Sequence, residues 1–218
     1  MRTLLQKITS SILILVLFFG LGLIFNSSLI ANEKLWIVVL ATIIMSESQP
    51  VVKKPDLLNP SDGYSMLGIM VMAIVVTNLT VIEFALNFKP KEFSRFSYGD
   101  GIGLIMILGG LIFRIYAIRK LGKYFSNAAE IKTEHILYDK GIYGKIRHPS
   151  YTGAIICIIG TIVFLHAWHT IGISLAIIFF AYSYRIKKEE KNLTKYFGQN
   201  YKVYCQHTGS LFPKLIKK

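Results

Sequence analysis

Hydrophobic residues in this sequence gather into long uncharged runs that are separated by polar segments. The first run, Ile8 to Phe25, holds 18 residues without a charge, which is enough to cross about 30 Å of hydrocarbon. A cleaved secretory signal needs small residues at its end, whereas Leu29-Ile30-Ala31 places a leucine there. We therefore expect an uncleaved helix. Leu35 to Met45 spans only 11 residues and predicts a short, tilted or re-entrant second helix.

Four more runs follow a polar, proline-containing segment that covers residues 46–63 and reads as a loop outside the membrane. They are Tyr64 to Phe88, Tyr98 to Ile118, Tyr151 to Leu165 and Ile171 to Tyr184. The last two are joined by a short segment, which predicts an antiparallel helical hairpin over residues 149–185. The pattern as a whole predicts an all-α, polytopic integral membrane protein with five or six transmembrane helices.

A few polar side chains interrupt these apolar runs or lie at their ends. Glu83 and Arg114 each lie near a run end; we expect Glu83 at the membrane interface and Arg114 reaching out toward the following basic segment. His166 and His169 offer only two ligands, so no metal site is predicted. The two cysteines, Cys157 and Cys205, match neither a disulfide framework nor a metal-ligand spacing.

The composition agrees with a membrane protein and explains the charge. Hydrophobic residues make up 53% of the chain, and the net charge is +13. With six crossings, 20 of the 25 lysines and arginines lie on the side of both termini; with five, 19 lie on the side of the C-terminus. Either count places residues 119–147 and the C-terminal tail on one basic face, which should be cytoplasmic. We expect a bacterial inner membrane and no nucleic-acid partner, since no aromatic stacking platform accompanies the basic residues.

The segment just before the hairpin carries a candidate anion site. Pro149 is a favourable first helical residue, so Arg147 and His148 would lie at the positive end of the helix that it starts. Exposed backbone N–H groups, a guanidinium and an imidazole would then face a carboxylate or phosphate at the membrane surface. An Arg-His pair in this position is otherwise an ordinary headgroup anchor.

The hairpin should bring charged residues of the opposite sign to the same place. Two helices of about 17 residues rise about 25 Å out and about 25 Å back, so the chain returns to the end where it started. Arg185 and Glu189 share one helical face, and Glu190 adds a second carboxylate. We therefore expect these three residues beside Arg147 and His148, unless they form only a solvated Arg-Glu pair.

These residues resemble the isoprenylcysteine carboxyl methyltransferase family, membrane methyltransferases related to phospholipid N-methyltransferases. The resemblance runs from His135-Ile136-Leu137-Tyr138 through Arg147-His148-Pro149-Ser150-Tyr151 to Arg185-x-x-x-Glu189-Glu190. It falls within about the last 95 residues, and the N-terminal half adds only hydrophobicity. We accordingly divide the chain into N-terminal transmembrane helices, residues 1–118, and an isoprenylcysteine carboxyl methyltransferase-like domain, residues 119–218.

The resemblance implies that S-adenosyl-L-methionine binds without a Rossmann domain, in a cytoplasmic pocket built on the last helical hairpin. The residues that it implies for the donor are His135, Ile136, Leu137, Tyr138, Tyr143, His148, Pro149, Ser150, Tyr151, Glu189 and Glu190. Glu189 would pair with the ammonium group of the donor, and Arg185 would face the methyl acceptor. We add Arg147, with Glu190, as a partner that supports the catalytic residues.

The expected activity is methyl transfer to a lipophilic acceptor that enters from the bilayer. A carboxylate such as that of an isoprenylcysteine is favoured, because it arrives ionised and Arg185 can hold it bidentately, whereas an amine would need deprotonation and would be repelled. A phospholipid amine or a thiol remains an alternative acceptor. A membrane transporter or assembly subunit without catalysis is the rival from another class. Transport is disfavoured, since the few charged residues within the spans, such as Glu83 and Arg114, lie near the span ends.

Overall fold

The computed structural model describes residues 4–50, 58, 64–88, 97–125 and 136–214. In these residues every predicted apolar run forms a helix. The helices are α1 (Leu4–Phe25), α2 (Glu33–Glu47), α4 (Ser65–Asn87), α5 (Tyr98–Leu121), α6 (Pro149–Phe164), α7 (Ile171–Phe197) and α8 (Gln199–His207), with short 3-10 turns at Ser27–Ala31, Gly122–Tyr124 and Gly141–Gly144. The prediction of an all-α chain is confirmed for the described residues, which contain no named strand.

The ends of α6 and α7 follow local sequence signals to different degrees. Helix α6 begins at Pro149, as expected from a residue whose fixed φ suits the first helical position. The apolar run that predicts α7 ends at Tyr184, and the helix continues for 13 more residues to Phe197. Its added part is rich in lysine and glutamate, which are strong helix formers. It stops at Gly198, which has a φ of 58° and so takes a conformation that favours glycine.

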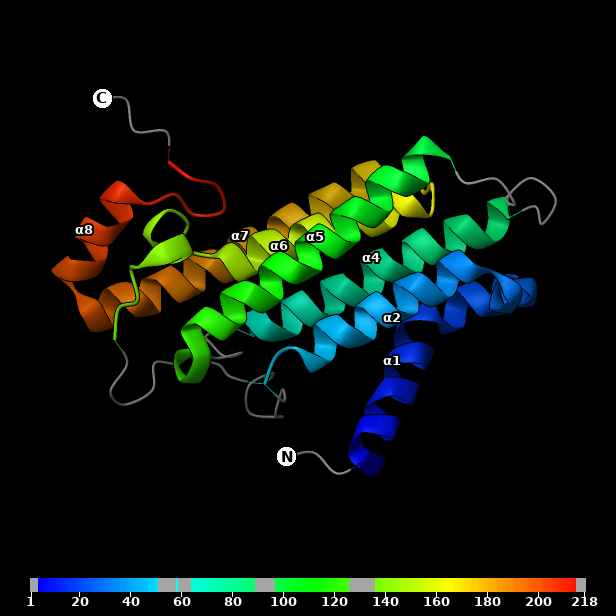
Figure 1. Ribbon diagram of the computed structural model, residues 1–218, viewed down its shortest axis with the longest axis horizontal. Coiled ribbons are helices and arrows are strands. Elements are labelled where there is room, and N and C mark those ends of the chain that lie inside the picture. Colours follow the sequence, from blue (N-terminus) through cyan, green and yellow to red (C-terminus); the bar gives the residue numbers. More distant parts are fainter. Residues whose placement is uncertain (1–3, 51–57, 59–63, 89–96, 126–135, 215–218) are drawn as a thin grey trace.

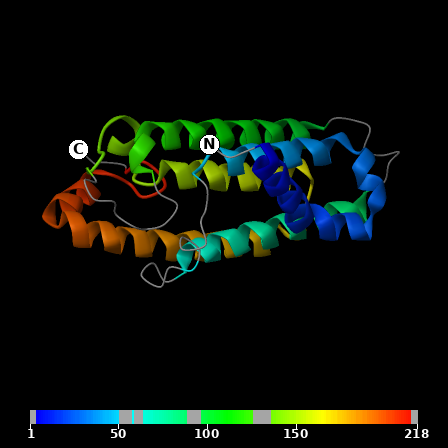
Figure 2. The same ribbon diagram turned by 90° about the horizontal axis from the view of Figure 1, so that it is seen from below.

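The long helices lie side by side along one axis, and α1 is steeply inclined to them (Figure 1). Seen from below, α5 and α6 form one side of the molecule and α4 and α7 the other (Figure 2). By length and composition, α4 and α5 are candidate membrane spans, and residues 12–25 and α6 are shorter apolar helices. The number of crossings, five or six, stays a prediction.

Helices α5 and α6 pack with their backbones unusually close. A Cβ atom at Gly110 would lie 2.6 Å from the backbone nitrogen of Cys157 and 2.6 Å from the carbonyl oxygen of Gly153. Gly153 and Gly160 of α6 are equally tight against α5, each with backbone atoms 2.7 Å from such an added Cβ. Small residues at this interface therefore set the distance between the helix that carries Arg114 and the helix that starts beside the candidate site.

This contact gives a prediction with an internal control. Gly110→Ala is expected to lower the free energy of unfolding by about 1–3 kcal/mol, because the added methyl must push α5 from α6. Gly109→Ala should leave stability unchanged or slightly higher, since nothing lies within 4 Å of a Cβ at Gly109. Thermal unfolding of both variants in the same detergent checks this. Equal melting temperatures would show that the α5–α6 contact is loose.

The end of the molecule that holds the hairpin turn is fastened by two buried acids. The carboxylate of Glu83 accepts hydrogen bonds from the backbone N–H groups of His169 at 2.9 Å and Thr170 at 2.8 Å, at the start of α7. Asp100 accepts from Lys34 Nζ at 2.6 Å, and its carboxylate lies 2.7 Å from His166 Nε2. Glu83 is therefore buried in the packing of α4 against the turn rather than exposed, and each histidine has a carboxylate partner.

The expectation that Arg114 reaches out toward the basic segment is wrong. Its side chain is 8% exposed and lies between helices. Nη1 donates to the carbonyl oxygen of Ser150 at 3.0 Å, and Nη2 donates to Oε1 of Gln49 at 2.6 Å. Tight α5–α6 packing brings the Ser150 carbonyl within reach of the guanidinium, so the side chain finds partners inside the protein.

Candidate functional site

The candidate site lies at the end of the molecule opposite the hairpin turn, where the segment before α6 meets the C-terminal half of α7 (Figure 1). Residues 209–211, which follow α8, form hydrogen bonds with residues at the start of α6. The backbone N–H groups of Arg147 and His148 donate to the carbonyls of Gly209 at 2.9 Å and Ser210 at 3.0 Å. The hydroxyl of Thr152 donates to the carbonyl of Leu211 at 2.6 Å. Sequence reasoning did not foresee this pairing of the tail with the residues around the start of α6.

Arg147, His148 and Glu190 form one half of the cluster. Arg147 Nε donates to Glu190 Oε1 at 2.8 Å, and Nη1 donates to the carbonyl of Thr208 at 2.5 Å. The same Glu190 oxygen lies 3.1 Å from His148 Nε2. The predicted meeting of these residues across the hairpin is confirmed. The carboxylate of Glu190 thus joins Arg147 to His148.

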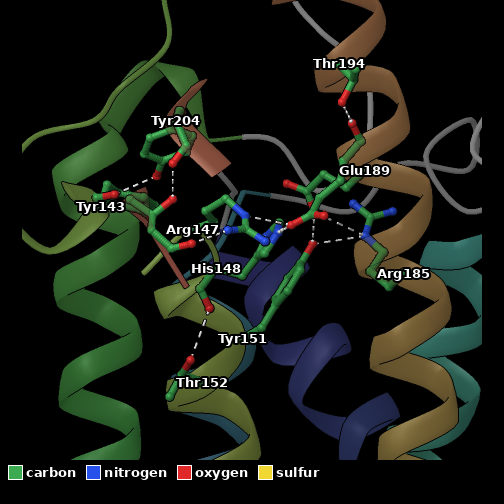
Figure 3. A network of polar contacts seen from close by, with 11 residues as sticks. Tyr143, Arg147, His148, Tyr151, Thr152, Arg185, Glu189, Thr194 and Tyr204 are labelled. Atoms are coloured by element: carbon green, nitrogen blue, oxygen red, sulfur yellow. Dashed lines mark hydrogen bonds and ion pairs between the residues drawn. The ribbon is translucent and has the colours of Figure 1, made fainter. Parts of the chain in front are cut away.

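Tyr151, Arg185 and Glu189 form the other half (Figure 3). The Tyr151 hydroxyl donates to Glu189 Oε2 at 2.5 Å and accepts from Arg185 Nε at 3.0 Å. That oxygen of Glu189 lies 3.9 Å from Arg185 Nε and 3.9 Å from His148 Nδ1. The Tyr151 ring stacks on His148 with an interplanar angle of 4°. Glu189 therefore has one close partner, the Tyr151 hydroxyl, and two basic side chains at 3.9 Å, those of Arg185 and His148.

Burial and basic neighbours act in opposite directions on Glu190. Burial raises the pKa of its carboxyl, but hydrogen bonds from His148 and Arg147 and their charges outweigh burial and hold the pKa below the ordinary value of 4.5. Burial lowers the pKa of Arg147, and the bond to Glu190 more than reverses this. The Arg147–Glu190 pair therefore stays ionised at neutral pH.

This lowered pKa predicts a pH-dependent contribution to stability. A carboxyl whose pKa is lower in the folded state stabilises the protein above its unfolded-state pKa, and the effect is lost as the pH falls through the folded-state pKa. Glu190→Gln should therefore melt below wild type at pH 7, and the difference should shrink below pH 4.5. Melting curves of both proteins across this range check the prediction. A difference independent of pH would contradict it.

Of the other expected donor residues, His135 falls outside the described residues. Tyr143 is buried: its hydroxyl donates to the Ala117 carbonyl of α5 at 3.1 Å, and Tyr138 packs edge-on against its ring at 5.7 Å. Leu137 is partly buried and Ile136 is 52% exposed. Pro149 and Ser150, in the first turn of α6, are buried. The Tyr143 hydroxyl thus connects the segment before α6 to α5.

A cavity of about 340 Å³ opens from the cluster into the helix bundle. Its lining is mostly apolar and comes from α1, α2, α4, α6 and α7, with Phe18, Met72 and Ile158 among its residues. Its polar lining residues include Glu47, Gln49, Arg114, Tyr151 and Arg185. Tyr151 and Arg185 therefore belong both to the cavity and to the polar cluster. Such an apolar space with a few convergent polar groups is typical of a small-molecule site.

Sequence reasoning missed three partners that shape this site. Arg185, 2% exposed, donates from Nη1 to the Ser65 hydroxyl at 2.8 Å. Gln49 binds Arg114, and the Thr208 carbonyl binds Arg147. All three contacts join residues more than 60 positions apart, and no local signal marks them. In the described residues, no group of three or more histidine, cysteine, aspartate or glutamate side chains could hold a metal ion.

Comparisons with known proteins find one family and relatives that share one name. The model of the isoprenylcysteine carboxyl methyltransferase (ICMT) family matches residues 103–195, which hold most of α5 and α7 and all of α6. A probable protein-S-isoprenylcysteine O-methyltransferase of Oryza sativa subsp. japonica is 34% identical over 147 residues, covering 66% of this chain and 75% of the rice protein.

Two further relatives are named protein-S-isoprenylcysteine O-methyltransferases. The protein-S-isoprenylcysteine O-methyltransferase of Xenopus laevis is 39% identical over 121 residues, which are 53% of this chain and 42% of the frog protein. That of Saccharomyces cerevisiae is 27% identical over 153 residues, 69% of this chain and 61% of the yeast protein. These relatives are eukaryotic, so the expected placement in a bacterial inner membrane finds no support in them.

Proposed function

Since this chain belongs to the isoprenylcysteine carboxyl methyltransferase family, we propose that it transfers a methyl group from S-adenosyl-L-methionine to the carboxylate of a prenylated cysteine at a membrane. One observation carries the proposal: Tyr151 and Arg185 line the apolar cavity and also contact Glu189 of the polar cluster. A lipophilic acceptor and a charged, water-soluble donor can therefore meet at these two side chains. Neither methylation of an amine or thiol nor a role without catalysis is favoured, because the relatives are named O-methyltransferases.

The donor set of the polar cluster fits S-adenosyl-L-methionine. Glu189 is 28% exposed and offers a carboxylate to the ammonium group of the donor. His148 and Tyr151 would hold its amino-acid end, and residues 135–138 with Tyr143 would flank the rest. Glu190 and Arg147 would keep His148 in place through the contacts at 3.1 Å and 2.8 Å. When bound there, S-adenosyl-L-methionine would supply a methyl group that an ionised carboxylate takes directly, the electrons of the broken carbon–sulfur bond staying on sulfur.

Arg185 would orient the acceptor. Its guanidinium is fixed by Tyr151 and Ser65, so a carboxylate bound to it has one preferred direction toward the methyl group. Because the acceptor arrives ionised, the protein needs no general base. What the chain supplies is alignment, a positive charge at the attacking carboxylate and exclusion of water by the surrounding helices.

The apolar part of the cavity would hold the prenyl chain. Each buried CH₂ group contributes about 0.8 kcal/mol to binding, so a hydrocarbon chain gains much of its affinity there. We propose that the acceptor enters laterally from the bilayer and that the site faces the cytoplasm. We also propose that residues 119–218, which include the hairpin, form the methyltransferase domain. The basic residues of that segment and the tail support this orientation.

A transfer assay tests the proposed function. Purified protein in lipid nanodiscs is given S-adenosyl-L-methionine with a labelled methyl group and either N-acetyl-S-farnesylcysteine or phosphatidylethanolamine. We expect label in the farnesylcysteine product, released by mild base as an ester is, and none in the phospholipid. Methylation of the amine alone, or of neither acceptor, would overturn the proposal.

A further inference from the structure

Arg114 is a buried cation with no carboxylate partner among the described residues. Its guanidinium contacts two neutral oxygens, the Ser150 carbonyl at 3.0 Å and the Gln49 amide at 2.6 Å. The N–H group on Nε is shielded from solvent and has no hydrogen-bond acceptor. A buried charge in such a state is unfavourable until an anion compensates it. Arg185, by contrast, already has Glu189 at 3.9 Å.

The position of Arg114 indicates where that anion would come from. Arg114 lines the same cavity as Arg185 and Tyr151, and the Ser150 carbonyl that it binds belongs to the residue next to Tyr151. Glu47 also lines the cavity, but no ion pair joins its carboxylate to Arg114 among the described residues. Ala154, Cys157 and Tyr182 in the same lining bring no charge. An apolar molecule in the cavity with one carboxylate at its polar end would meet both arginines.

We propose that Arg114 is a second arginine for the acceptor carboxylate and makes the site prefer an ionised carboxyl group over an uncharged head group. This inference rests on the proposed function and extends it to substrate selection and product release. Methyl transfer converts the carboxylate into a neutral ester. The attraction of the product to Arg114 is then lost while the prenyl chain remains bound, so the charge on Arg114 favours exchange of the ester for a new acid.

A pair of ligands that differ only in this charge tests the proposal without turnover. Binding of N-acetyl-S-farnesylcysteine and of its methyl ester is measured by titration into full-length wild type, Arg114→Met and Arg114→Lys in nanodiscs. We expect wild type to bind the acid at least about 10-fold more tightly than the ester, as a charge-assisted contact does. In Arg114→Met the affinities for the acid and the ester should differ by no more than about threefold, with the affinity for the ester as in wild type. Arg114→Lys should restore part of the preference for the acid.

The outcomes separate a binding role from a structural one. Equal loss of affinity for acid and ester in Arg114→Met would show that Arg114 only holds α5 against α6, and an unchanged preference would show that it does not contact the carboxylate; either overturns the proposal. If Arg114→Met does not fold, Arg114→Gln and Arg114→Lys are read in the same way. Wild type that prefers the acid yet transfers no methyl group would defeat the proposed function and leave this inference standing.

Discussion

Replacing Arg185 with methionine is expected to lower the kcat of methyl transfer by roughly 10²-fold, the effect of losing the group that aligns the attacking carboxylate with the methyl group. Arg185 is 2% exposed and held by Tyr151 and Ser65, so no other side chain can take its place without repacking. Single-turnover rates with saturating donor and farnesylcysteine acceptor measure the effect.

Two variants control for the loss of charge and for folding. Arg185→Lys keeps the charge but not the fork of donors and should show an intermediate rate. Lys187→Met removes a positive charge from an exposed position of the same helix and should keep the wild-type rate. A wild-type kcat in Arg185→Met would mean that the acceptor is oriented by other residues.

Replacing Glu189 with glutamine is expected to raise the Kd of S-adenosyl-L-methionine about 100-fold, since the ammonium group of the donor would lose its charged partner. Glu189 is the carboxylate that the cluster leaves available, because Glu190 is engaged by Arg147 and His148. Isothermal titration into detergent-purified protein measures the Kd.

The control for this variant removes the same charge elsewhere. Glu33→Gln, at the exposed start of α2, should bind the donor as wild type does. Melting temperatures of both variants show whether the fold is kept. Equal donor affinity in Glu189→Gln and wild type would remove the donor's ammonium from its proposed place.

The helices and the meeting of their ends could be predicted from local patterns. Uncharged runs mark the helices, and the short turn around Trp168 forces α7 back along α6, which is why Arg147 and Glu190 meet at 2.8 Å. The resemblance to the family supplied the candidate site residues, and of these His135 lies outside the described residues. The structure confirms that the two halves of the site come together; their individual roles remain predictions.

What the sequence did not reveal depends on contacts between distant parts of the chain. Ser65 meets Arg185 across 120 positions, and the tail reaches the start of α6 through backbone groups that carry no side-chain signal. Arg114 was misjudged because its position near the end of a run suggests a surface location. The glycines of α5 and α6 instead bring the Ser150 carbonyl close enough to hold it inside.

A structure of the protein with S-adenosylhomocysteine and N-acetyl-S-farnesylcysteine bound tests the shared pocket most directly. We predict that the ammonium group of the nucleotide lies within about 4 Å of the Glu189 carboxylate, the usual limit of an ion pair. The farnesyl chain should fill the cavity, with its carboxylate at Arg185. A nucleotide bound at the hairpin-turn end, or a farnesyl chain lying outside the helix bundle, would contradict the account.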